Sequence, residues 1–119
     1  MDAKTLCDNG STVYLVPEIK IIPGKKIFDA IVDGEITEFK NVVGGTNALE
    51  KRFIESRFQA PNVFINTEES TLSRRQIIAT LAATRNGTKY PMINAYQGGM
   101  IILKIKGISR LIHLAIDGL

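Results

Sequence analysis

The sequence predicts one α/β (α+β) domain, in which a mixed β-sheet is flanked by helices. Three features predict this class: a hairpin signal at Asp33-Gly34, two amphipathic helical segments, and β-prone apolar runs between them. The chain of 119 residues suffices for one hydrophobic core, so residues 1–119 are treated as a single domain. The predicted order is an αβββαβ core, followed by a second helix and a C-terminal hairpin.

The first half of the chain carries a short helix and three strands. An Asp-Gly pair between β-prone runs favours a two-residue hairpin turn, and Pro17 ends the strand before it. The predicted elements are a helix over residues 3–8, a strand over 12–17, and hairpin strands over 27–32 and 35–42.

The second half alternates helices and strands. Its first helix is expected to begin at Asn47, with Glu50 completing a capping box, and to end before Pro61. Leu49 and Phe53 recur at helical spacing and predict one buried face. The later elements are a strand over residues 63–65, a helix over 70–86, a loop over 89–99, and hairpin strands over 100–106 and 109–116.

Composition excludes several kinds of site. No apolar run approaches the roughly 18 residues of a membrane span, and the single Cys7 excludes an internal disulfide and a Cys-based metal cluster. Residues 1–60 carry 8 basic and 9 acidic side chains, whereas residues 61–119 carry 7 basic and 3 acidic ones. This distribution suits a polyanion bound beside an acidic centre, although a chance asymmetry explains it as well.

The hairpin places a candidate site on two strands. A two-residue loop pairs Val32 with Glu35, and the same register sets Asp29 across from Glu38. Directly opposed side chains have Cβ atoms about 5 Å apart on one face, and Lys40 shares that face because strand side chains alternate. A three-residue loop would move Asp29 off this face.

The chemistry of this trio follows from its charges. Facing carboxylates repel, and a divalent cation between them relieves the repulsion. Mg²⁺ prefers one or two carboxylates plus water and phosphate oxygens, so Asp29 and Glu38 are predicted metal ligands, and Lys40 assists the attacking water. Glu18, after the first strand, is either a third carboxylate ligand or a surface residue. Alternatively, Lys40 merely neutralises Glu38 on a solvated face.

These residues also carry a resemblance to a nuclease motif. Phe28-Asp29 followed by Glu38-Phe39-Lys40 resembles the PD-(D/E)xK motif, with Phe28 where the family usually has Pro. Together with residues 13–18, 29–34 and 59–63, they resemble the C-terminal toxin domains of contact-dependent growth inhibition proteins. The similarity covers roughly residues 5–80. The predicted αβββαβ order matches the core of that nuclease fold.

The resemblance implies an endoribonuclease toxin domain that cleaves RNA, in particular tRNA. It also implies delivery from the surface of the producing cell into the target-cell cytoplasm, and a cognate immunity protein that silences the domain. In similar nucleases the first core helix lines the cleft, which makes Arg57 and Gln59 candidates for substrate contact.

Basic residues near the C-terminus are further candidates for substrate binding. Lys104 and Lys106 are predicted on one face of a late strand, and Arg110 begins the next. These three side chains can follow a nucleic-acid backbone, or they can guard a sheet edge against aggregation.

Three other functions remain open from the sequence. The trio would serve a DNA endonuclease equally well. A metal-independent toxin of the barnase/EndoU/colicin/RelE group would depend instead on residues such as Lys40, Arg57 and His113. A non-catalytic protein-interaction domain would leave the hairpin charges solvated. Nothing in the sequence indicates an oligomeric state.

Overall fold

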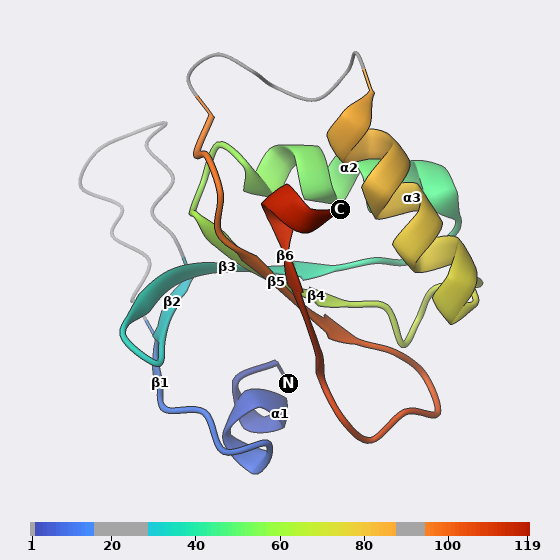
Figure 1. Cartoon of the computed structure of the whole chain (residues 1–119). Coiled ribbons are helices and arrows are strands. Elements are labelled where there is room, and N and C mark those ends of the chain that lie inside the picture. The colour runs from blue at the N-terminus through green and yellow to red at the C-terminus, as the bar shows by residue number, and fades with distance from the viewer. Residues whose placement is uncertain (1, 16–28, 88–94) are drawn as a thin grey trace, which may run out of the picture.

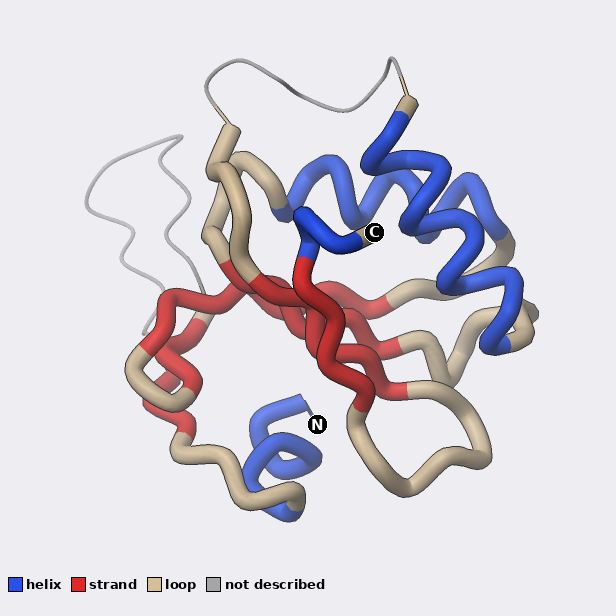
Figure 2. The backbone as a smooth tube through the Cα atoms, viewed as in Figure 1, coloured by secondary structure: helices blue, strands red, loops and turns tan. Residues whose placement is uncertain are grey.

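The protein is a six-stranded sheet with helices on both faces (Figure 1). The computed structural model describes residues 2–15, 29–87 and 95–119. The elements are α1 (Asp2–Asp8), β1 (Val13–Leu15), β2 (Ala30–Val32), β3 (Glu35–Asn41), α2 (Thr46–Ser56), β4 (Asn62–Asn66), α3 (Arg74–Asn86), β5 (Met100–Lys104), β6 (Ile112–Ala115) and the 3₁₀ turn η1 (Ile116–Gly118). In Figure 2, α2 and α3 lie together on one side of the strands, and α1 lies on the other.

The sheet is mixed, as predicted, and its strands follow chain order from β1 to β6. β1, β2 and β3 are antiparallel neighbours, β3, β4 and β5 are parallel, and β6 returns antiparallel to β5. Parallel neighbours need a crossover connection, and α2 and α3 supply these two crossovers. The αβββαβ core and the C-terminal hairpin are therefore confirmed.

The β2–β3 hairpin has the predicted two-residue turn. Val32 pairs with Glu35 and Ala30 with Thr37. Asp33 and Gly34 have φ of 50° and 83°, as a type I′ turn requires, and Asp is one of the few residues other than Gly that tolerates this region. The register alternative with a three-residue loop is therefore excluded.

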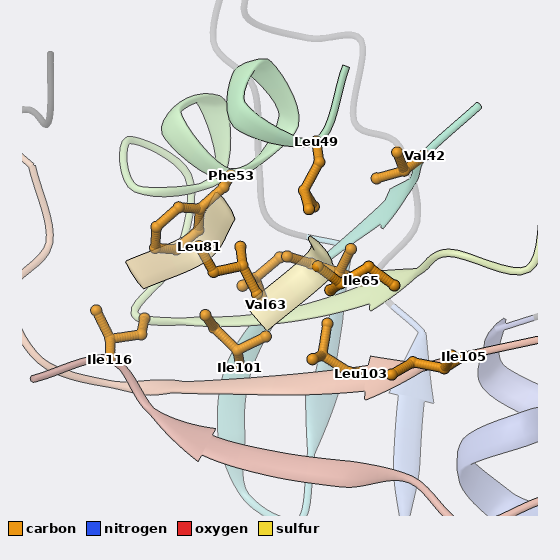
Figure 3. Close-up of a cluster of buried hydrophobic side chains, with 11 residues drawn as sticks. Val42, Leu49, Phe53, Val63, Ile65, Leu81, Ile101, Leu103, Ile105 and Ile116 are labelled. Atoms are coloured by element: carbon orange, nitrogen blue, oxygen red, sulfur yellow. The ribbon is translucent and has the colours of Figure 1, made fainter. Parts of the chain in front are cut away.

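Two apolar clusters hold the layers together. On the α2 and α3 side, Leu49 and Phe53 of α2 reach down to Val63 and Ile65 of β4 (Figure 3). On the α1 side, a smaller cluster is formed by five buried residues: Leu6, Ala30, Val32, Phe64 and Ile102. Successive residues of β4 thus belong to opposite clusters, because side chains along a strand point alternately to its two faces.

The two long helices begin at other residues than predicted. α2 begins at Thr46 after Gly45, without a side-chain cap bond, so the predicted capping box at Asn47 and Glu50 is wrong. A capping box does exist at α3, where Ser73 and Gln76 exchange side-chain bonds to each other's backbone N–H groups. The helix predicted over residues 70–86 consequently begins at Arg74. No helix of the described residues is both long enough and apolar enough to cross a bilayer.

A buried arginine joins the end of α2 to the segment before β5. The fully buried Arg57 donates to the carbonyl oxygens of Pro61 at 2.8 Å and of Tyr96 and Gly98 at 2.7 Å each. Gly99 follows with φ of +91°, and a Cβ there would lie 1.8 Å from the Pro61 oxygen. Arg57 and Gly99 together fix where β5 starts beside β4.

We expect Arg57→Met to lower the free energy of unfolding by about 3 kcal/mol or more, because three carbonyl oxygens would lose their donor in the interior. Urea denaturation followed by circular dichroism measures this change. Arg75→Met, on the exposed side of α3, is the matched control and should stay within about 0.5 kcal/mol of the wild type. Equal effects of the two substitutions would contradict the structural role of Arg57.

Candidate active site

Glu38 and Lys40 lie on the face of β3 that α2 covers. In the parallel register Glu38 is beside Val63 and Lys40 beside Ile65, and both of these β4 residues belong to the cluster under α2. Glu38 is accordingly fully buried, and Lys40 is 6% exposed. The alternative in which these charges sit on a solvated face is therefore wrong.

The ammonium group of Lys40 faces a carboxylate from α2. Lys40 Nζ lies 3.8 Å from Glu55 Oε2, and Glu55 Oε1 lies 3.6 Å from a guanidinium nitrogen of Arg52. Sequence reasoning missed Glu55, because helical periodicity identifies the buried stripe of α2 but not which flanking side chain leans towards β3.

Asp29 stands at the start of the neighbouring strand. The structure shows the register of β2 with β3 as far as Ala30 opposite Thr37. The pairing of Asp29 with Glu38 would continue that register by one residue, and it stays a prediction. Its side chain is half-buried, and its Oδ2 accepts a hydrogen bond of 2.9 Å from the backbone N–H of Phe39. The bond holds the Asp29 carboxylate against the backbone of β3 at Phe39.

Negative charge gathers at this end of the hairpin. Burial raises the pKa of the Asp2 carboxyl on α1, and the nearby charges of Asp29 and Glu68 raise it further, against a hydrogen bond from Asn66 that lowers it. Because α1 lies on the other side of the sheet from α2 (Figure 2), the charge of Asp2 acts on Asp29 from the side opposite to the one that Glu38 and Lys40 occupy.

The predicted metal ligands are only partly described. The described residues contain no group of three His, Cys, Asp or Glu side chains that could hold a metal ion. Glu18, the predicted third ligand, lies outside the described residues. Asp29 and Glu38 are the two predicted ligands that the structure describes, and their binding of a metal stays a prediction.

The predicted substrate-binding residues are scattered. The Arg57 guanidinium bonds to the chain's own carbonyls, and Gln59 Oε1 is buried with no hydrogen-bond partner among the described residues. Lys104 donates to the carbonyl of Ile108. β5 ends at Lys104, so the prediction that Lys106 shares a strand face with it is wrong: Lys106 and Arg110 are exposed in the β5–β6 loop.

The three residues of the metal-independent alternative are not brought together. His113 on β6 pairs with Ile102, which belongs to the α1-side cluster, whereas Lys40 faces α2. β4 and β5 also separate β3 from β6, a span of about 14 Å at the usual strand spacing. Arg57 is fully buried at the C-terminal end of α2. A shared catalytic role for this set finds no support in the geometry.

Comparison with known proteins bears on the fold. Neither a family model nor a curated protein matches the sequence. A chain of the CdiA-CT/CdiI toxin and immunity complex from Burkholderia pseudomallei has a similar structure, with a TM-score of 0.64 and 23% sequence identity, covering 94% of this chain and 77% of that chain. The chain therefore has the fold found in this toxin and immunity complex, in agreement with its resemblance to contact-dependent toxin domains.

Proposed function

We propose that the chain is an endoribonuclease toxin domain of a contact-dependent growth inhibition system. One observation carries the proposal: a buried carboxylate and a buried ammonium, Glu38 and Lys40, share the face of β3 that α2 covers, and the half-buried Asp29 directly precedes β2 of the same hairpin. The fold shared with a chain of the CdiA-CT/CdiI complex supports the toxin assignment. The preference for RNA, and for tRNA in particular, rests on the sequence resemblance.

The energetics of burial support a functional reading of this pair. Removing a charged group from water costs several kcal/mol, and apolar residues of similar volume often serve a fold as well or better. The surrounding layer is apolar, with Val63 and Ile65 beside Glu38 and Lys40. A structural role alone therefore gives little reason for charges at these two positions, whereas catalysis needs them in a dry, fixed environment.

The proposed chemistry divides the work among three side chains. Asp29 and Glu38 would hold a divalent metal, Mg²⁺ by its preference for carboxylates, and the metal would supply Lewis acidity and lower the pKa of the attacking water. Substrate approaches from the Asp29 side, because Asp29 is half-buried and Glu38 is fully buried. Lys40 stabilises the negative charge that develops on the phosphate.

Two further interactions belong to the proposal. Exposed Lys106 and Arg110 contact the nucleic-acid backbone and add salt-dependent affinity. A cognate immunity protein binds the domain, which is supported by the similar chain's occurrence in a toxin and immunity complex. The domain acts after delivery into the cytoplasm of a target cell.

Metal removal tests the chemistry directly. We expect EDTA to abolish cleavage of total tRNA by the purified domain and excess Mg²⁺ to restore it, because in the proposed mechanism the metal lowers the pKa of the attacking water and stabilises the charge on the phosphate. Gel analysis of the tRNA fragments is the measurement. Undiminished cleavage in EDTA would contradict a metal-dependent mechanism.

Asp29→Asn separates catalysis from binding. The substitution keeps an oxygen acceptor for the Phe39 N–H but removes a charge, so we expect cleavage to fall at least about 100-fold while the melting temperature holds or rises. Growth inhibition on expression in sensitive cells should be lost in parallel. If toxicity persists at the wild-type level, a non-catalytic interaction domain becomes the better account.

The basic loop offers a third test. We expect Lys106→Gln combined with Arg110→Gln to raise KM with little change in kcat, and to reduce the slope of log affinity against log salt by about 1 to 2. Binding measured at several salt concentrations gives the slope. Arg74→Gln with Arg75→Gln, at the start of α3, is the control pair, and an equal loss there would show only a general charge effect.

A further inference from the structure

The proposed function gives no role to Glu55, whose carboxylate faces the ammonium group of Lys40. Glu55 on α2 approaches Lys40 on β3 with 3.8 Å between Oε2 and Nζ. The Lys40 side chain is 6% exposed, whereas that of Glu55 is 36% exposed. We propose that Glu55 is the positioning residue for Lys40, an inference that rests on the proposed nuclease function.

Lysine needs such a partner to act from a buried position. Its side chain carries about 2 kcal/mol of rotamer entropy, so a fixed carboxylate nearby restricts where the ammonium group lies. The carboxylate of Glu55, on the helix that covers this face of the sheet, attracts the ammonium group and so orients it. At 3.8 Å the contact is longer than a hydrogen bond, so Glu55 orients the charge without taking one of the ammonium's protons.

Glu55 is itself held in place. Its Oε1 lies 3.6 Å from Arg52, one helical turn earlier, so the carboxylate is set between two cations. It also borders a surface hollow of about 450 Å³ together with Asn47, Glu50, Lys51 and Ile54. The carboxylate therefore stands between the buried ammonium and solvent, and α2 contributes to the site through Glu55 rather than through Arg57.

A positioning role differs from a structural ion pair in its kinetic consequences. If Glu55 acts through Lys40, its loss removes an interaction made in the transition state, which lowers kcat and leaves KM nearly unchanged. Its loss also has no further effect once Lys40 has been replaced. A purely structural pair changes stability but leaves kcat of the folded protein unaffected.

The experiment is a double-mutant cycle on the purified domain with total tRNA and Mg²⁺. We expect Glu55→Gln to lower kcat about 10- to 100-fold with KM within about twofold, and Glu55→Asp to retain part of the lost rate. Glu55→Gln combined with Lys40→Met should be no slower than Lys40→Met alone. Glu69→Gln, at an exposed position after β4, should match the wild type.

Two kinetic outcomes would overturn the inference. One is a wild-type kcat for Glu55→Gln. The other is that Glu55→Gln lowers kcat as much in the Lys40→Met background as it does in the wild type. Thermal melting of the four proteins of the cycle, which are the wild type, Glu55→Gln, Lys40→Met and the double variant, separates this inference from the proposed function. If the wild type leaves tRNA uncut, the nuclease proposal fails. Non-additive melting shifts would then still support the Glu55–Lys40 contact, and additive shifts would overturn it.

Discussion

The ammonium group of Lys40 lies between the sheet and α2, in a layer that it shares with the Glu38 carboxylate and with the aliphatic and aromatic side chains of the larger cluster. Its position constrains the elements around it. β3 must direct the Lys40 side chain towards α2, and α2 must bring Glu55 to 3.8 Å from its ammonium group. Leu49 and Phe53 must pack closely enough on β4 to hold the helix at that distance (Figure 3). The apolar contacts supply the stability of the layer, since burial of such side chains is the dominant favourable contribution to folding. The charged contact contributes the chemistry.

The hairpin turn exerts a second constraint. Because Asp33 and Gly34 form a two-residue turn, the pairs of the hairpin are fixed as far as Ala30 opposite Thr37, and a continued register would set Asp29 opposite Glu38. A slip of one residue would turn Asp29 to the other face of the sheet. The bond from the Phe39 N–H to Asp29 then holds the carboxylate beside β3. A local turn preference thus fixes the register of the hairpin, and the long-range packing of α2 determines how deeply Glu38 is buried.

Those parts of the fold that depend on local signals could be predicted from the sequence. The Asp-Gly turn predicted the hairpin, the helical spacing of Leu49 and Phe53 predicted α2, and the short apolar run over residues 63–65 predicted the buried strand β4. Features that depend on tertiary contacts were missed. The Asn47 cap failed because α2 starts after Gly45. Lys106 was assigned to a strand that ends at Lys104. The burial of Arg57 requires carbonyls from residues 39 and 41 positions away, and no local pattern reports such partners.

The account depends on Asp29 and Glu38 acting together on one cation. Crystals of the domain soaked in Mn²⁺, a substitute for Mg²⁺ that scatters anomalously, test this claim most directly. The account predicts an anomalous peak between the two carboxylates, with metal–oxygen distances of about 2.1 Å, that disappears in Glu38→Gln. A protein that cleaves RNA in the same solution while its Mn²⁺ peak lies elsewhere, or while no peak forms at all, would contradict it.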